Sequence, residues 1–283
     1  MQMNIQYISA EDVKDLLPDR ALDSHKGDFG RVLLLCGSVG YTGAAALAAM
    51  GALRCGTGLL YLAVPESIYA IEATKLTEPI IRPLPDEDGM LSTKAVPAVL
   101  DLLPKMNAVL IGPGLGQCEG TNSVLQAVLN NFTGPVIIDA DGITMLSLHK
   151  NILRGRTSPT IITPHPGEFR RLAHLEDDRV SSAVSLARDL GVVVLLKGHN
   201  SVITDGDQCF VNTTGNPGMA TGGSGDILAG MIAGLVGQGI DPLLATAVGA
   251  WIHGAAGDIC AKEIGQYGML PTDMLEVIPR LIK

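Results

Sequence analysis

The chain has 283 residues, of which 47% are hydrophobic and 17% are charged. This length suits one large globular α/β domain or two small ones, and it is long enough to bury a sizeable core. The net charge of −9, a pI near 5.1 and an aromatic content of 4% argue against a nucleic acid as the partner.

The first half of the chain alternates short apolar segments with helical patterns. A capped helix is predicted at residues 9–17, where Ser9 precedes two acids and an apolar pattern. Continuous apolar runs are typical of strands that are buried on both faces. Such strands are predicted at residues 32–36, 59–64 and 108–111, a short or irregular strand at 80–85, and helices at 44–55 and 122–129.

The second half continues the same alternation. Strands are predicted at residues 135–138, 160–162 and 192–196, and helices at 183–190, 226–236, 243–262 and 272–282. Two further strands, 201–204 and 208–211, are expected to form a hairpin around Asp205-Gly206. The most apolar region of the chain is residues 227–259. Because polar residues and Pro242 interrupt it, this region indicates two buried helices and not a membrane span. The whole pattern predicts a mainly parallel sheet covered by helices, in a single domain over residues 1–283.

The five cysteines are scattered and form no CxxC pair. This indicates free thiols in a reducing cytoplasm, with Cys36 and Cys55 in the core and no zinc site. The N-terminal MQMNIQYISAEDV lacks a basic segment followed by an apolar run, so no signal peptide is expected.

Residues 212–226, NTTGNPGMATGGSGD, form a glycine-rich loop that leads into a helical pattern. Such a loop presents unpaired backbone N–H groups at the positive end of a helix, which suits a phosphate. The glycines Gly222, Gly223 and Gly225 let the backbone approach an anion closely. Asp226 is then placed to accept a proton from an attacking hydroxyl. A glycine-rich turn with Asp226 as a helix N-cap is the alternative interpretation.

Five other polar or glycine-rich motifs each follow a predicted strand. They are GSVGYTG (37–43), GPGLG (112–116), DADG (139–142), TPHPGE (163–168) and KGHNS (197–201). In open α/β sheets ligands bind at the carboxyl ends of the strands, so these motifs are expected to converge with the glycine-rich loop. GSVGYTG has neither the dinucleotide glycine spacing nor the GKS or GKT of a P-loop.

Each polar residue in these motifs has a plain structural alternative. Lys197 either contacts a phosphate or is a solvated strand-end lysine. His165, between two prolines, is either a positioned contact or a turn histidine. Glu168 either caps the following helix or joins the water shell of a Mg²⁺ ion. His253, inside an apolar helix, is interpreted as a core histidine, whereas Asp139 and its neighbour Asp141 either act with the metal or turn the chain.

The motifs as a set resemble one family. GSVGYTGAAALAA, GPGLG, DADG, TPHPGEF, KGHNSVI and NPGMATGGSGDILAGMIAGL are similar, in consistent order from Lys26 to Cys260, to the ADP/ATP-dependent NAD(P)H-hydrate dehydratases. The resemblance implies a ribokinase-like three-layer α/β sandwich without a lid domain. It also implies repair of the hydrated cofactors (6S)-NADHX and (6S)-NADPHX, with Mg²⁺ and with ADP or ATP as phosphoryl donor, ADP being favoured.

The resemblance also implies roles for particular residues. The ADP or AMP nucleotide is expected at Lys197, Gly198, His199, Asn200, Ser201 and Gly225. The hydrated nicotinamide nucleotide is expected at Ala45, Gly114, Gly116, His165 and Asp226. The anion hole is expected at Gly222, Gly223, Ser224 and Gly225, where Ser224 replaces the threonine or alanine common in the wider fold. Asp226 is implied as the base that lets the C6 hydroxyl take a phosphoryl group, after which phosphate is eliminated.

The same resemblance implies a cytoplasmic homotetramer. The epimerase domain fused to some bacterial members is not seen, so dehydratase activity alone is expected, alongside a separate epimerase. Neither a nucleic acid nor a membrane is expected as a partner. A kinase for a small vitamin precursor, a non-catalytic nucleotide-binding module and a purely structural protein remain as alternatives.

Overall fold

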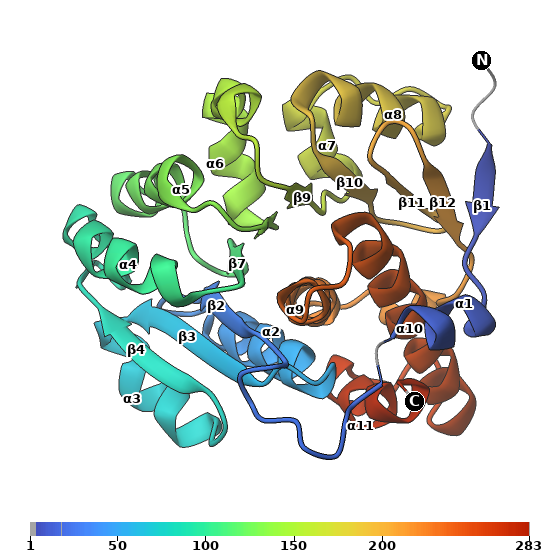
Figure 1. The fold of residues 1–283 in the computed structure, drawn as a ribbon, viewed down its shortest axis with the longest axis horizontal. Helices are drawn as coiled ribbons and strands as arrows, with labels where there is room; N and C mark the ends of the chain where they lie inside the picture. The colour runs from blue at the N-terminus through green and yellow to red at the C-terminus, as the bar shows by residue number, and fades with distance from the viewer. Residues whose placement is uncertain (1–3, 18, 283) are drawn as a thin grey trace.

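The computed structural model describes residues 4–17 and 19–282, so the first three residues of the N-terminal stretch lie outside the described part. Its main sheet has ten strands, which curve around helix α9 (Figure 1). In sheet order they are β1 (Ile5–Tyr7), β12 (Cys209–Asn212), β11 (Ser201–Thr204), β10 (Val193–Leu196), β9 (Thr160–Ile162), β8 (Val136–Ile138), β7 (Ala108–Ile111), β2 (Arg31–Leu35), β3 (Leu59–Pro65) and β4 (Ile80–Leu84).

Neighbouring strands run parallel except at β11, which is antiparallel to both β10 and β12. The β11–β12 pair is the predicted hairpin around Asp205-Gly206. Within the described residues, the strands outside this sheet are β5 (Asp86–Glu87) and β6 (Met90–Leu91), which pair with each other. The predicted mainly parallel sheet is therefore confirmed.

Both faces of the sheet are covered by helices. Successive side chains of a strand point to opposite faces, and in β2 Leu34 enters one apolar core while Leu33 enters the other. One core is built with α1 (Ala10–Leu16), α2 (Thr42–Arg54), α3 (Glu66–Lys75), α9 (Ser224–Gly237), α10 (Pro242–Glu263) and α11 (Pro271–Leu281). The other is built with α4 (Val96–Leu102), α5 (Glu119–Asn131), α6 (Asp141–His149), α7 (Pro166–Leu172) and α8 (Arg179–Leu190).

Four 3₁₀ turns complete the described elements: η1 (Thr93–Ala95), η2 (Leu103–Lys105), η3 (Lys150–Gly155) and η4 (Pro217–Met219). Helices α3, α4 and α6 have no counterpart in the sequence prediction. Helix α10 is long and apolar enough to cross a membrane, but 72% of its apolar 18-residue window is buried inside the protein. The prediction that this apolar region forms two buried helices, α9 and α10, is confirmed.

Helices α2 and α9 touch through their backbones. A Cβ atom on Gly230 would lie 2.0 Å from the carbonyl oxygen of Ala48, and one on Gly51 would lie 2.4 Å from that of Ile227. Only glycine permits so close a crossing. The crossing sets the position of the glycine-rich loop that precedes α9 relative to the GSVGYTG turn that precedes α2.

Candidate active site

The strand-end motifs meet at one edge of the sheet, as the parallel topology predicts. The polar contacts between them involve both backbone and side-chain groups. Hydrogen bonds join Gly37 to Pro113 (2.8 Å), Gly116 to Asp141 (2.9 Å), Thr163 to Asp139 (2.8 Å) and Lys197 to Pro164 (2.9 Å). The predicted convergence of these motifs is therefore present in the structure.

An ion pair between Lys197 and Asp139 lies at the centre of this edge. The Lys197 Nζ is 2.7 Å from Asp139 Oδ1 and 4.0 Å from Glu168 Oε2, with the two carboxylate side chains almost fully buried. Because its own side chain is only 19% exposed, Lys197 is not a solvated strand-end lysine. Burial favours a lower pKa for the ammonium, but the carboxylates of Asp139 and Glu168 outweigh it and raise the pKa of Lys197.

The backbone between Asp139 and Asp141 is strained. Ala140 has φ of +50° and ψ of −120°, a conformation that costs a non-glycine residue free energy. Asp139 accepts a hydrogen bond from the Lys197 ammonium, whereas Asp141 begins α6 and accepts a hydrogen bond from the Gly116 amide. Neither aspartate merely turns the chain, because each holds a neighbouring motif in place.

The glycine-rich loop ends in backbone amides that lack an acceptor among the described residues. Helix α9 has Gly223 as its N-cap, with φ of +99° and no side-chain cap, and the first helical bond runs from the Ile227 amide to the Gly223 carbonyl (3.2 Å). The amides of Gly225 and Asp226 come before that bond, and neither has an acceptor in the described part of the chain. The interpretation of Asp226 as the N-cap is wrong, because the left-handed Gly223 starts the helix one turn earlier.

Asp226 lies half-buried on the first turn of α9. Burial and, to a smaller extent, the charge of Asp139 together raise the pKa of its carboxyl group to about 6, with Lys197 partly offsetting them. A carboxylate with a pKa near neutrality is suited to general-base catalysis at physiological pH.

The structure brings the glycine-rich loop and the KGHNS motif together. A Cβ atom on Gly225 would lie only 3.5 Å from Lys197 Nζ. The ammonium therefore lies next to the residue whose amide is free, and the two groups can stabilise a single anion. This is the arrangement expected of a phosphate site.

The rest of KGHNS forms an exposed loop, and hydrogen bonds from Arg179 fix its backbone. The Arg179 guanidinium donates to the carbonyl oxygens of Leu196 (3.0 Å), Lys197 (3.0 Å) and His199 (2.5 Å). Asn200 adopts a left-handed conformation, with φ of +52°, which asparagine tolerates better than most residues. Nothing in the sequence pointed to Arg179, because its partners are carbonyls that only the fold brings within reach.

His165 and Glu168 form a capping box at the start of α7. The Gly167 amide donates to His165 Nδ1 (2.9 Å), and the His165 amide donates to Glu168 Oε2 (2.8 Å). In its neutral form the His165 ring would therefore carry its proton on Nε2, and the side chain is 54% exposed. Glu168 is confirmed as a cap, and burial raises the pKa of its carboxyl group.

The predicted nicotinamide-side residues lie where α2 meets the GPGLG turn. Gly114 has φ of +60°, and a Cβ atom there would lie 2.7 Å from the Cβ of Ala44. Ala45 is fully buried beneath Gly37, so it shapes the floor of the site and presents no surface to a ligand. Gly116 is fixed through its amide by Asp141.

The cysteines take no part in this cluster. All five are free, and Cys36 and Cys55 are buried in the core as predicted. Burial raises the pKa of both thiols, so neither forms a reactive thiolate at neutral pH.

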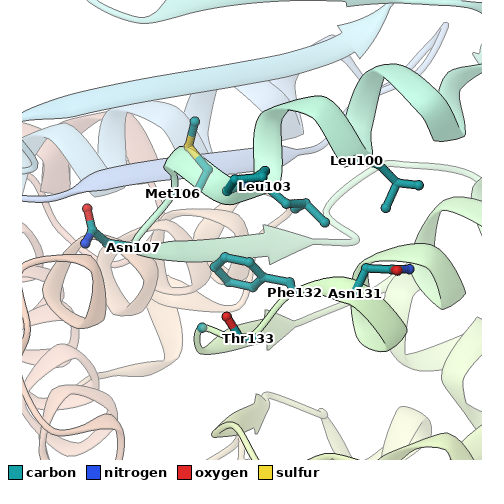
Figure 2. Close-up of a pocket in the computed structure, with 9 residues that line it drawn as sticks. Leu100, Leu103, Met106, Asn107, Asn131, Phe132 and Thr133 are labelled. Atoms are coloured by element: carbon teal, nitrogen blue, oxygen red, sulfur yellow. The ribbon is translucent and has the colours of Figure 1, made fainter.

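A cavity of about 570 Å³ lies at the opposite edge of the sheet. Figure 2 shows it between Leu103 and Met106, around η2, and Phe132 and Thr133, which follow α5. Asn107, another residue of its wall, immediately precedes β7. Among the described residues, no charged side chain lines this cavity, so it lacks the cation and the general base that the other edge provides.

Known proteins and solved structures are similar to this chain along most of its length. It is 42% identical to a bifunctional NAD(P)H-hydrate repair enzyme of Moorella thermoacetica, over 99% of this chain and 54% of that protein. It is 37% identical to the ADP-dependent (S)-NAD(P)H-hydrate dehydratase of Bacillus subtilis, over 99% of both. The crystal structure of the Bacillus subtilis ADP/ATP-dependent NAD(P)H-hydrate dehydratase, co-crystallised with ATP and Mg²⁺, matches with a TM-score of 0.85 and 32% identity, over 99% of this chain and 98% of that one.

The chain spans about half the length of the bifunctional relatives it matches. Its architecture is the predicted ribokinase-like three-layer fold. The family model described as NAD(P)H-hydrate dehydratase matches residues 32–280, and this is most of the chain. The chain belongs to the NAD(P)H-hydrate dehydratase family.

Proposed function

We propose that this chain, acting as a single domain, dehydrates (6S)-NADHX and (6S)-NADPHX to NADH and NADPH, with ADP or ATP as phosphoryl donor. The observation that carries the proposal is Asp226, half-buried beside the free Gly225 amide and the Lys197 ammonium. A base, an anion hole and a cation in one place are what phosphoryl transfer to a hydroxyl requires.

In this reaction Asp226 removes the proton from the C6 hydroxyl of the hydrate. The hydroxyl oxygen forms a bond to the terminal phosphorus of the nucleotide, and the bond from that phosphorus to its bridging oxygen breaks. The amides of Gly222, Gly223 and Gly225 stabilise the negative charge on the phosphoryl oxygens. The Ser224 amide, predicted to join them, instead donates to the Thr221 carbonyl (3.4 Å). Phosphate then leaves C6 far more readily than hydroxide would, pushed by the lone pair of the ring nitrogen, and loss of the proton from C5 restores the dihydropyridine.

We assign the nucleotide to the exposed KGHNS loop with Gly225, and the hydrate to the space bounded by Gly114, Gly116 and His165. Mg²⁺ usually keeps several waters and is held by one or two carboxylates together with substrate phosphates, so it does not need a protein cage. Glu168 fits this use through water, because its Oε2 is taken by the His165 amide while its Oε1 accepts no backbone hydrogen bond from the described residues and lies 3.4 Å from His165 Nε2. Bound Mg²⁺ would neutralise charge on the phosphates.

The direct test is to incubate the pure protein with NADHX, Mg²⁺ and either ADP or ATP, and to follow NADH absorbance. We expect NADH to form only when a nucleotide is present, with ADP the better donor. A stable phosphorylated product without NADH would indicate a small-molecule kinase instead. Nucleotide binding without turnover of any hydrate would indicate a non-catalytic module.

The raised pKa of Asp226 predicts a pH dependence. A base must be unprotonated, so kcat/KM should be flat above about pH 6 and fall about tenfold per pH unit below it. An aspartate with its ordinary pKa of 3.8 would keep kcat/KM flat down to about pH 4. Steady-state measurement of kcat/KM between about pH 4 and pH 7 distinguishes the two cases. A kcat/KM that stays constant down to about pH 5 would contradict the role assigned to Asp226.

We further propose that the protein is a cytoplasmic homotetramer that works beside an NAD(P)HX epimerase activity. Exposed apolar side chains on the segment between α10 and α11, namely Ile264, Tyr267 and Leu270, support a self-association surface. Light scattering at micromolar concentration tests this, and a mass of 29.5 kDa would exclude it.

A further inference from the structure

We propose that His253 is a positioning residue for the reaction, because it holds the Ser224 carbonyl and thereby aims the Gly225 amide at the transferring phosphoryl group. This inference rests on the proposed function. His253 was expected only to fill the core, and its role follows from the place where its ring meets the glycine-rich loop.

The contact is short and buried. His253 lies on α10 with only 6% of its surface exposed, and its Nε2 is 2.9 Å from the Ser224 carbonyl oxygen and 3.4 Å from the Ser224 hydroxyl. A carbonyl oxygen can only accept a hydrogen bond, so His253 Nε2 carries the proton. The histidine is thus a donor directed at the first residue of α9.

The geometry of the peptide bond transmits this contact to the site. The Ser224 carbonyl and the Gly225 N–H belong to one planar trans peptide, in which they point in opposite directions. Fixing the carbonyl oxygen on His253 therefore fixes the direction of the Gly225 N–H, away from α10. That amide has no acceptor among the described residues, and a Cβ atom on the same residue would lie 3.5 Å from Lys197 Nζ. The same hydrogen bond polarises the peptide and makes the N–H a better donor.

His253 does this without adding charge. Burial lowers the pKa of its imidazole to about 4, and the nearby Lys197 charge acts in the same direction, against the hydrogen bond to Ser224. The ring is therefore neutral at physiological pH. It keeps one proton on Nε2, and the contact with Ser224 is of constant strength through the neutral range.

Helix α10 holds the glycine-rich loop at several other points. Its carbonyls at Ala250 and Trp251 accept hydrogen bonds from Asn212 (3.0 Å) and Thr214 (3.0 Å). Asp258, which lies in no recognisable motif, accepts from the Gly215 amide (2.9 Å) and from Asn216. These contacts fix the first part of the loop, whereas the contact from His253 reaches the peptide whose amide faces the anion site.

The test compares two substitutions with NADHX, ADP and Mg²⁺. In His253→Leu the side chain is of similar size but has no N–H to donate to the Ser224 carbonyl. In His253→Gln the side-chain amide N–H lies close to the position of Nε2. Deleting an oxyanion-hole donor lowers kcat by about 10²–10³-fold. A Gly225 N–H that is present but wrongly oriented should therefore lower kcat by about 10- to 100-fold. We expect this loss in His253→Leu with the KM for NADHX within about threefold, because the donor acts mainly in the transition state. His253→Gln should recover most of it.

A His253→Leu variant that melts as wild type and keeps kcat within about threefold of wild type would overturn the inference, since that lies well inside the expected loss. So would a folded His253→Gln variant as slow as His253→Leu, which would assign the effect to packing. If His253→Leu does not fold, the tautomer of His253 in the wild-type protein decides, measured by ¹⁵N NMR of the imidazole. A proton on Nε2 supports the inference, and a proton on Nδ1 overturns it.

NMR of the Gly225 amide also tests the role of His253 independently of the dehydratase reaction. If wild-type protein fails to convert NADHX, the proposed function fails, yet the Gly225 amide signal can still be followed while ADP and Mg²⁺ are added. A shift of that signal in wild type that is lost in His253→Leu and regained in His253→Gln supports the positioning role. An equal shift in all three proteins contradicts it.

Discussion

Replacing Asp226 by asparagine should leave a folded protein that binds nucleotide and loses about 10²–10⁴-fold in kcat, the usual value of a positioned general base. Asparagine has nearly the same shape but cannot take the proton of the C6 hydroxyl. The helix should not suffer, because Gly223 and not Asp226 begins α9, and no side chain caps it. The loss should fall on kcat more than on KM, since the proton moves only in the transition state.

A matched control is available at the start of the next helix. Asp241 is the N-cap of α10, where its Oδ1 accepts from the amides of Leu243 (3.0 Å) and Leu244 (3.1 Å). Asparagine caps a helix about as well as aspartate, so Asp241→Asn should melt as wild type and keep its activity. The measurements are steady-state NADH formation and thermal melting. If a well-folded Asp226→Asn variant stayed within about threefold of wild-type kcat, the base would have to be sought elsewhere, first at His165.

Replacing Lys197 by methionine should lower the free energy of unfolding by about 3–5 kcal/mol, because it removes one partner of a buried ion pair. The Asp139 side chain is only 2% exposed, and its strongest neutralising contact is Lys197 Nζ at 2.7 Å. Without that cation, Asp139 must either stay charged in a buried place or take up a proton, and both cost free energy. Urea denaturation measures the change independently of any effect on nucleotide binding.

The exposed pair Arg154–Asp189 is the control for Lys197. Its side chains are 60% and 52% exposed, with the charged atoms 3.1 Å apart, so Arg154→Met should change stability by only about 0–1 kcal/mol. Adding Asp139→Asn to Lys197→Met removes the stranded carboxylate, and the double variant should be more stable than the sum of the two single changes predicts. Strict additivity would show that the two side chains do not depend on each other.

The sequence by itself determined the order and type of most elements. The apolar run at residues 108–111 coincides with β7, and the Asp205-Gly206 turn joins β11 to β12 as expected. Short buried strands that alternate with helices leave little choice but a parallel sheet, and in such a sheet the segments after the strands share one edge. The convergence of GPGLG, DADG, TPHPGE and KGHNS was therefore predictable from local pattern and chain order alone. Motif resemblance added the family.

Only the tertiary structure decided which polar groups meet. Lys197 contacts Asp139, and His253 contacts Ser224, through side chains whose reach depends on strand register and on the crossing of packed helices. No local pattern encodes such pairings, because each partner lies on a different element. The start of α9 was misplaced for a related reason: the left-handed Gly223 is packed against Leu47 of α2, and that contact is set by a distant part of the chain. Local sequence thus fixed the elements, while packing between them fixed the hydrogen bonds and charges on which the chemistry depends.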